Sequence, residues 1–385
     1  MPGSCLRIGL LIRALTLGGA ERQLVNLAVG MRRAGHDVQV LVFYREGTAL
    51  EAEVEAAGIP LVDLRKRGRW DLPAFLGRLR SAVRAGELDV IYSFLPTANV
   101  LAALIWGGSD SPAVVWGIRG TDAWRDSNDW LGRAVVLAEQ RLKQRAIAII
   151  ANSTTAIEKC RALGWPSARL HLVPNGLDPD AFRFDPRARD VMRNAWGMCP
   201  TERLIGVAGR LDPVKGLEVL LSATKTLSAE SPALRVIVAG EGSSTYTSSL
   251  RHQVRELGLE AQVLWLGRIE NMAGFYSAID LLCLPSLSEG CSNVVGEALA
   301  CGTPVVATRV GDNALLIPDA SWLAEAGNPA DLARVLRLVL ASSGGTCREV
   351  LRRDILDHLD FSTLIQRTVA ILRSAAEPPR SSWAP

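Results

Sequence analysis

The chain has 385 residues, of which 48% are hydrophobic and 5% aromatic, and its formal net charge is +3. This length exceeds the usual size of one hydrophobic core, so we expect two domains. The composition indicates an α/β globular enzyme and excludes a disordered or fibrous chain. The small net charge gives no support for a nucleic-acid partner, and no run of about 18 uncharged apolar residues is present to span a bilayer.

The apolar start over residues 6–17 is interrupted by Arg7 and Arg13, which favours a first buried strand over a signal peptide. Seven cysteines lie at positions 5, 160, 199, 283, 291, 301 and 347, without a Cys-x-x-Cys pair. This pattern indicates reduced thiols in a cytoplasmic protein, with neither a disulfide framework nor a zinc site.

Short apolar runs alternate with amphipathic helical stretches, and the whole pattern occurs twice. Such alternation predicts doubly wound parallel sheets with helices on both faces. The strands expected in the first sheet are 8–12, 38–43, 90–94, 113–117 and 146–151. Those expected in the second sheet are 204–208, 234–239, 263–266, 281–284 and 305–307.

The stretch 177–200 is polar, rich in charge and contains three prolines, which is typical of a connection between domains. We therefore predict an N-terminal domain over residues 1–178, a linker over 179–200 with a short helix at 188–196, and a C-terminal domain over 201–357. A helix over 358–376 is expected to pack back on the N-terminal domain. The tail 377–385, with its prolines and serines, is expected to fray.

Two loops of the first domain follow expected strands. Gly18 and Gly19 precede a helix over 24–31, and a glycine-rich turn that binds no ligand is the plain alternative for them. Arg119 and Asp122 come after the strand 113–117 and are the best candidates there for a reactive site. A lone Arg after a strand is more often a salt-bridge partner, so that alternative stays open.

A basic run, Arg65-Lys66-Arg67-Gly68-Arg69-Trp70, ends in an aromatic residue. Such a run could contact anionic lipid, at about 1 kcal/mol for each cation near the surface. A solvated loop is the alternative.

In the second domain, Gly209 ends an expected strand and delivers Arg210 and Lys215 to its carboxyl end, where open α/β sheets bind ligands. Two cations there would hold a diphosphate, whereas the alternative pairs Arg210 with a surface acid and leaves Lys215 solvated. The next strand is followed by Gly240-Glu241-Gly242. The two glycines permit close approach to a ligand, and a plain tight turn explains them equally well.

The segment 286–308 predicts a polar loop and then a helix that opens near Ser292 and closes at Gly302. Free N–H groups at Asn293 and Val294, together with the helix dipole, favour a phosphate. Glu297 lies about one turn inside the helix, where its carboxylate can accept both hydroxyls of a ribose. Solvated acids are the alternative for Glu289 and Glu297, but the apolar residues around Glu297 argue against it.

These motifs together resemble the retaining glycosyltransferases of family four, also called glycosyl transferases group 1. Glu289 and Glu297 match the Glu-x7-Glu signature of that family, and the segment 209–216 matches its pyrophosphate motif, Gly-Arg-Leu-x-x-x-Lys-Gly. Gly18 and Gly19 match its Gly-Gly-Ala-Glu loop. The turns at Asn152-Ser153 and Asn175-Gly176 also occur in family order, so the resemblance covers nearly the whole chain.

The resemblance implies a GT-B fold, in which two Rossmann-like domains face a central cleft. It implies transfer of a hexose-type sugar from a UDP- or GDP-sugar to a hydroxyl, with retention at the anomeric carbon. Arg210 and Lys215 would stabilise the departing diphosphate in place of a metal, so no metal cofactor is expected. Asp178-Pro179-Asp180 resembles the Pro-Asn-Gly-x-Asp turn of the family rather than a metal-binding motif.

By this resemblance, Glu297 would hold the ribose, Glu289 the donor sugar, and Gly18 and Gly19 would approach the sugar-phosphate across the cleft. The residues expected to be catalytic are Arg210, Lys215, Glu289, Arg119 and Asp122. Those expected to bind the donor are Gly18, Gly19, Gly209, Gly240, Glu241, Gly242, Gly290, Ser292, Asn293, Val294 and Glu297.

The expected acceptor is a glycan or a lipid-linked glycan precursor at the cytoplasmic face of the membrane, in surface polysaccharide or glycoconjugate biosynthesis. Many family members have an active-site His after the strand that corresponds to 113–117, and none of the four His of this chain falls there. Cys291 replaces a common aromatic, and Asp312-Asn313 stands where a second glycine is frequent.

Three alternative functions share parts of this sequence pattern. A dinucleotide oxidoreductase needs Gly-x-Gly-x-x-Gly after the first strand, and the spacing around Gly18 does not provide it. A sugar-nucleotide 2-epimerase has the same two-domain architecture and would convert the donor without an acceptor. A non-catalytic scaffold that binds a nucleotide sugar is the remaining alternative.

Overall fold

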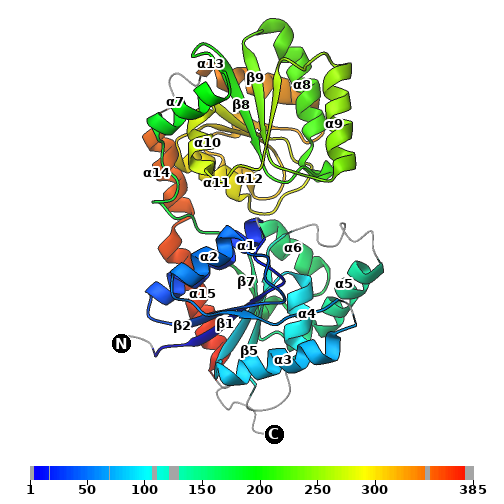
Figure 1. The fold of residues 1–385 in the computed structure, drawn as a ribbon, viewed down its shortest axis with the longest axis vertical. Helices are drawn as coiled ribbons and strands as arrows, with labels where there is room; N and C mark the ends of the chain where they lie inside the picture. Colours follow the sequence, from blue (N-terminus) through cyan, green and yellow to red (C-terminus); the bar gives the residue numbers. More distant parts are fainter. Residues whose placement is uncertain are drawn as a thin grey trace. The chain divides into compact units, whose positions relative to one another are not determined.

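The structure is a computed structural model that describes residues 4–16, 18–68, 70–105, 111–120, 130–342 and 347–377 (Figure 1). It divides into two compact units. One consists of Met1–Gly176 and Phe361–Pro385, and the other of Leu177–Asp360. Each unit is built around one parallel sheet, which confirms the predicted pair of α/β domains.

The sheet of the first unit has the strand order β3-β2-β1-β4-β5-β6-β7. Its strands are β1 (Arg7–Ile12), β2 (Asp37–Val42), β3 (Leu61–Asp63), β4 (Val90–Phe94), β5 (Ala113–Ile118), β6 (Ala148–Ala151) and β7 (Leu170–Leu172). Its helices are α1 (Gly19–Arg33), α2 (Ala49–Ala56), α3 (Leu72–Ala85), α4 (Pro96–Ile105), α5 (Trp130–Leu142), α6 (Thr154–Ala162) and α15 (Phe361–Ala376), with 3-10 turns at Lys143–Arg145 and Ser167–Arg169.

Side chains that alternate along each strand form a hydrophobic core on both faces of this sheet. Ile8, Leu10 and Ile12 of β1 point into one hydrophobic cluster, whereas Leu11 points into another on the opposite face. Successive side chains of a strand alternate between faces, so a strand buried on both sides must be apolar throughout. Helices α1 and α15 cover the first cluster, and α3 and α4 cover the second.

The sheet of the second unit has the order β10-β9-β8-β11-β12-β13. Its strands are β8 (Arg203–Ala208), β9 (Leu234–Ala239), β10 (Val263–Gly267), β11 (Leu281–Leu284), β12 (Val305–Thr308) and β13 (Leu323–Ala324). Its helices are α7 (Pro186–Ala195), α8 (Leu217–Glu230), α9 (Ser244–Glu256), α10 (Met272–Ala278), α11 (Asn293–Ala300), α12 (Asn313–Leu316), α13 (Pro329–Ser342) and α14 (Arg348–His358), with 3-10 turns η3 (Pro213–Lys215) and Ala320–Trp322.

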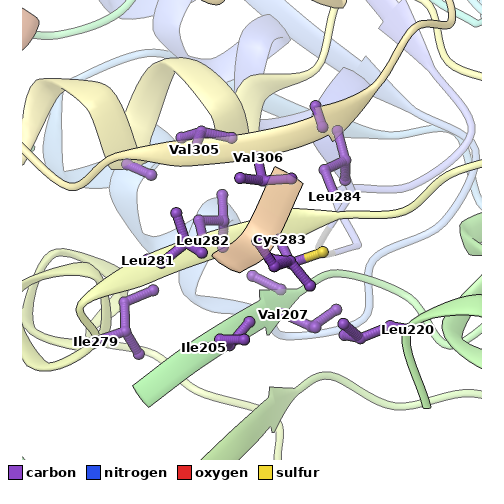
Figure 2. Packing of buried hydrophobic residues seen from close by; sticks show 14 of the residues in the cluster. Ile205, Val207, Leu220, Ile279, Leu281, Leu282, Cys283, Leu284, Val305 and Val306 are labelled. Carbon is purple, nitrogen blue, oxygen red and sulfur yellow. The ribbon is translucent and has the colours of Figure 1, made fainter. Parts of the chain in front are cut away.

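The central strands of the second unit are buried on both faces. Figure 2 shows side chains of β8, β11 and β12 packed side by side, among them Val207, Cys283 and Val306. Leu281–Leu284 is buried at every position. The loops that follow β8 and β11 start from this buried centre, at the carboxyl ends of the two strands.

The segment 179–200, expected as a linker, lies in the second unit and contains α7, which packs against α10. Arg189 Nη2 lies 2.6 Å from Asp280 Oδ1, and Arg193 Nη1 lies 3.3 Å from Asp280 Oδ2. The backbone N–H of Leu204 donates to the same Oδ2 at 2.9 Å. A buried carboxylate thus connects α7 to the starts of β8 and β11.

The last two helices of the chain belong to different units. Helix α14 belongs to the second unit, whereas α15 belongs to the first and packs on the face that α1 covers. Residues 378–385 of the tail expected to fray lie outside the described residues. Within the described ranges, no helix has the length and apolar character needed to cross a membrane.

Candidate functional site

The strand order of the second sheet reverses between β8 and β11. In open α/β sheets, ligands bind beyond the carboxyl ends of the strands at such a switch point. The loop 209–216 follows β8, and the loop 285–292 follows β11. Most of the site residues predicted from the sequence lie in these two loops or at the start of α11.

The loops after β8 and β9 pack backbone against backbone. A Cβ on Gly240, where φ is +150°, would lie 1.8 Å from the carbonyl oxygen of Gly209, so only glycine fits. The N–H of Leu211 donates to Glu241 O at 2.8 Å, and a Cβ on Gly242 would lie 2.1 Å from Leu211 O. These contacts give the glycines a structural role, whether or not they also touch a ligand.

The side chains of Arg210 and Lys215 project from the same loop into different environments. The Arg210 side chain is 64% exposed, and its Nη2 lies 3.2 Å from Asp212 Oδ2. The Asp212 side chain also caps η3, since its Oδ1 accepts from Val214 N at 3.1 Å. Lys215 ends η3, and its Nζ lies 2.6 Å from Glu289 Oε1 in the neighbouring loop.

Glu289 is an acid at the switch point whose side chain is only 10% exposed. Its Oε1 accepts from Ser286 Oγ at 2.6 Å as well as from Lys215. Gly216 lies against the same loop, where a Cβ would come 2.2 Å from Pro285 O. The alternative of a solvated loop acid is therefore wrong for Glu289, and that of a solvated amine is wrong for Lys215.

Helix α11 begins directly after this loop, with Ser292 at its N-cap and Asn293 and Val294 in its first turn. Its dipole places partial positive charge at that end. Arg352 Nη1 donates to Ala300 O at 2.6 Å at the other end of the helix. Glu297, one turn inside α11, accepts a hydrogen bond at Oε2 from Tyr276 Oη of α10 at 2.7 Å.

The remaining loop positions are placed around the same edge of the sheet. Gly290 accepts from the N–H of Asp312 at 3.0 Å, which ties the loop after β11 to the one after β12. Glu241 is exposed at the end of β9. The structure thus gathers the predicted residues of the second unit at the carboxyl ends of β8, β9 and β11.

The loop after β1 in the first unit contains Gly18 as N-cap of α1, and Gly19 as its first residue. Glu21 in the first turn accepts from Thr16 Oγ1 at 3.1 Å, and burial raises the pKa of its carboxyl. The sequence analysis did not name Glu21 as a site residue. Its position in the Gly-Gly-Ala-Glu loop, just after the first strand, was the signal that could have identified it. A half-buried acid therefore stands beside the two predicted glycines.

Arg119 follows β5 and is buried. Its Nη2 donates to Tyr92 Oη at 2.5 Å, its Nη1 donates to Asn175 Oδ1 at 3.1 Å, and the guanidinium lies 4.8 Å from the centre of the Phe94 ring. These three partners, which belong to the part of the chain that the structure describes, are neutral and therefore hold the guanidinium without cancelling its charge. Asp122, predicted beside it, lies outside the described residues.

The basic run contains Trp70, which is 89% exposed. Lys66 Nζ donates to the carbonyl of Gly68, and the N–H of Arg67 donates to Asp71 Oδ2 at 2.8 Å. Arg69 lies outside the described residues. Across the part of the chain that is described, no group of three or more His, Cys, Asp or Glu side chains could hold a metal ion.

Family models match both halves of the chain. A model described as glycosyl transferase 4-like domain matches residues 18–176, and one described as glycosyl transferases group 1 matches residues 202–342. Two doubly wound parallel sheets with these matches define a glycosyltransferase of the GT-B class. The chain belongs to the glycosyl transferases group 1.

Solved structures support the fold. The Anabaena protein Alr3699/HepE, solved in complex with UDP-glucose, has a TM-score of 0.83 and 23% identity, with 95% of this chain and 99% of that one covered. WaaG, a glycosyltransferase involved in lipopolysaccharide biosynthesis, has a TM-score of 0.74 and 18% identity, with 95% and 99% covered. The predicted GT-B fold is confirmed.

Curated relatives include the D-inositol 3-phosphate glycosyltransferase of Mycobacterium marinum, 30% identical over 246 residues. That match covers 62% of this chain and 52% of the relative. The Mycobacterium bovis enzyme of the same name is 35% identical over 189 residues, which cover 48% of this chain and 38% of the relative. The matched part of this chain thus spans about half or less of these relatives.

Proposed function

We propose that this protein is a retaining glycosyltransferase that moves a hexose-type sugar from a nucleoside diphosphate sugar to a hydroxyl group. The observation that carries this proposal is the ion pair between Lys215 and Glu289, which fixes a cation and an acid at the switch point of the second unit. UDP-glucose is the first donor to test, because the similar fold of Alr3699/HepE is solved with it. GDP-sugars are the second donor class.

The leaving group is a diphosphate, which gains negative charge as the bond to the sugar breaks. Arg210 and Lys215 supply positive charge from the loop after β8, and the start of α11 at Asn293 and Val294 supplies the helix dipole. Groups fixed in place before the reaction stabilise developing charge without reorganising, which is the main source of electrostatic catalysis.

The two acids have separate roles in the proposal. Glu289 binds hydroxyls of the donor sugar, and its contacts with Lys215 and Ser286 keep its carboxylate in one orientation. Glu297 binds the ribose diol, because a carboxylate can accept two hydroxyl donors at once. Gly209, Gly240, Glu241, Gly242, Gly290 and Ser292 are proposed as further donor contacts.

For the acceptor, we propose a hydroxyl of a glycan, of a lipid-linked glycan precursor or of a phosphorylated cyclitol. The last class is included because the curated relatives are named for D-inositol 3-phosphate. Arg119 and Asp122 are proposed for the acceptor side, since Tyr92 and Asn175, the described hydrogen-bond partners of Arg119, are neutral. A cytoplasmic site of action, at the membrane face through the run 65–70, belongs to the same proposal.

The proposal is tested by measuring thermal shifts with UDP, GDP, ADP and CMP, each with EDTA, and then release of UDP from UDP-glucose. A ligand at a hundred times its dissociation constant stabilises a protein by about 2.7 kcal/mol. One selective nucleoside diphosphate, followed by acceptor-dependent turnover with retained anomeric configuration, is the expected result. Donor conversion without an acceptor would indicate an epimerase, and binding without any turnover would indicate a scaffold.

A further inference from the structure

Tyr276 is a buried residue of α10, and its hydroxyl points at Glu297 of the proposed donor site. The side chain is fully buried, and its Oη donates to Glu297 Oε2 at 2.7 Å. A hydrogen bond to an ionised acceptor is shorter and stronger than one between neutral groups. This contact therefore restricts the orientation of the Glu297 carboxylate.

The phenol of Tyr276 can act only as a donor toward this carboxylate. Burial, and next the charge of Glu297, raise the pKa of Tyr276 well above its ordinary value. The hydroxyl therefore keeps its proton, and it has a single proton to give. Because a carboxylate has about four acceptor positions, this bond orients Glu297 while using one of them.

Tyr276 is itself held from two sides. Thr303 Oγ1 donates to the backbone carbonyl of Tyr276 at 2.7 Å. The ring packs against Phe275 and Phe182, with centroid separations of 5.7 and 6.3 Å. Since Arg352 also fixes the far end of α11, both partners of the hydrogen bond are attached to fixed backbone.

We propose that Tyr276 is a positioning residue that sets the preference of the site for a ribonucleotide, by holding Glu297 in the orientation that accepts both ribose hydroxyls. The inference rests on the proposed ribose role of Glu297. Tyr276 does not touch the donor in this proposal. Without its hydroxyl, the Glu297 carboxylate loses one of the contacts that restrict its orientation, and binding the diol must then restrict it at an entropic cost.

The test compares the dissociation constants of UDP, 2′-deoxy-UDP and inorganic pyrophosphate in the wild type and in Tyr276→Phe. We expect UDP to bind roughly 10-fold more weakly to the variant, because binding must then order the Glu297 carboxylate that Tyr276 holds in the wild type. The ratio of the 2′-deoxy-UDP constant to the UDP constant should fall, and pyrophosphate should bind unchanged. Thr224→Val is the matched control, because it deletes a buried hydroxyl that donates to Leu220 O within α8.

Three outcomes separate the roles. If Glu297→Gln lowers the 2′-deoxy-UDP to UDP ratio and Tyr276→Phe does not, the positioning role is overturned and the ribose role stands. If neither variant changes the ratio although UDP binds, the ribose role of Glu297 fails, and the inference fails with it. If both lower it and the double variant matches Glu297→Gln alone, the two residues act as one unit.

Loss of folding would not hide these results. The ratio is measured on folded protein by calorimetry, so a smaller folded fraction changes the stoichiometry and leaves the ratio intact. Thr303→Val offers a milder second variant, because it removes only the hydrogen bond to the Tyr276 carbonyl. A smaller fall in the same ratio supports the inference, and an unchanged ratio in both variants contradicts it.

Discussion

The Nζ atom of Lys215 lies 2.6 Å from Oε1 of Glu289, although 74 positions separate the two residues in the sequence. Their side chains are 26% and 10% exposed, so each charge compensates the other away from bulk water. Leu287 N also donates to Val214 O at 2.7 Å, so the loops after β8 and β11 are joined by backbone and side chain together. The proposed catalytic pair is therefore also part of the structure of its loops.

Replacing Lys215 should reduce both turnover and stability. We expect Lys215→Ala to lower kcat roughly a hundredfold, since one lost transition-state contact costs about 3 kcal/mol. The thermal midpoint should also fall, because Glu289, whose side chain is only 10% exposed, loses the cation with which it pairs. Turnover is measured with UDP-glucose, and the thermal midpoint is measured by calorimetry. Lys225→Ala, at an exposed position on α8, is the control. Near-native turnover would remove Lys215 from the mechanism.

Replacing Arg210 should reduce turnover alone. Its side chain is 64% exposed, and exposed ion pairs contribute less than about 1 kcal/mol to stability. We expect Arg210→Ala to lower kcat roughly a hundredfold, as for Lys215, with a thermal midpoint close to that of the wild type. Arg334→Ala removes a comparable exposed pair with Asp331 and is the control. A large loss of stability in Arg210→Ala would assign the residue a structural role instead.

Apolar patterning predicted the central strands because β11, and β1 and β8 after their first residue, are buried at every position and contain no polar side chain. It missed β3, β7 and β13, which have two or three residues each. Strands this short give no periodicity to recognise. The glycine-rich loops and the two acids were also recognisable, because a motif of fixed spacing is local.

Contacts between distant segments could not be predicted. Arg193 is buried against Asp280, which lies far along the chain, and it also donates to backbone carbonyls such as that of Ala278. The sequence does not show these partners, so the polar stretch that forms α7 was predicted as a linker. The hydrogen bond from Tyr276 to Glu297 likewise depends on how α10 packs beside α11. Such pairs follow from tertiary packing, and single-sequence patterns do not report it.

Asp280 should be a major source of stability in the second unit. Asp280→Ala leaves the guanidinium groups of Arg189 and Arg193 without their shared acid, and breaking a buried pair costs about 3 to 5 kcal/mol. Urea unfolding at neutral pH measures this as a lower midpoint with an unchanged slope. Asp354→Ala, which removes an exposed ion pair with Arg353, is the control. Equal midpoints for the two variants would contradict the structural role.

Glu139 should make the first unit less stable as the pH rises. This α5 residue is 1% exposed, and its Oε1 accepts from Asn99 Nδ2 at 2.8 Å. Burial raises the pKa of its carboxyl from 4.5 to about 7. The folded state therefore binds the proton more tightly than the unfolded state, so stability is highest below pH 4.5 and is lost as the pH rises to about 7.

A shift of this size corresponds to about 3 kcal/mol between the two ends of that pH range. Glu139→Gln keeps a neutral group that can accept from Asn99, so its stability should lack this slope and should exceed that of the wild type at pH 8. Urea unfolding from pH 5 to pH 8 measures the difference, with the exposed Glu158→Gln on α6 as control. A constant difference between Glu139→Gln and wild type across this range would show that the carboxyl of Glu139 does not titrate there.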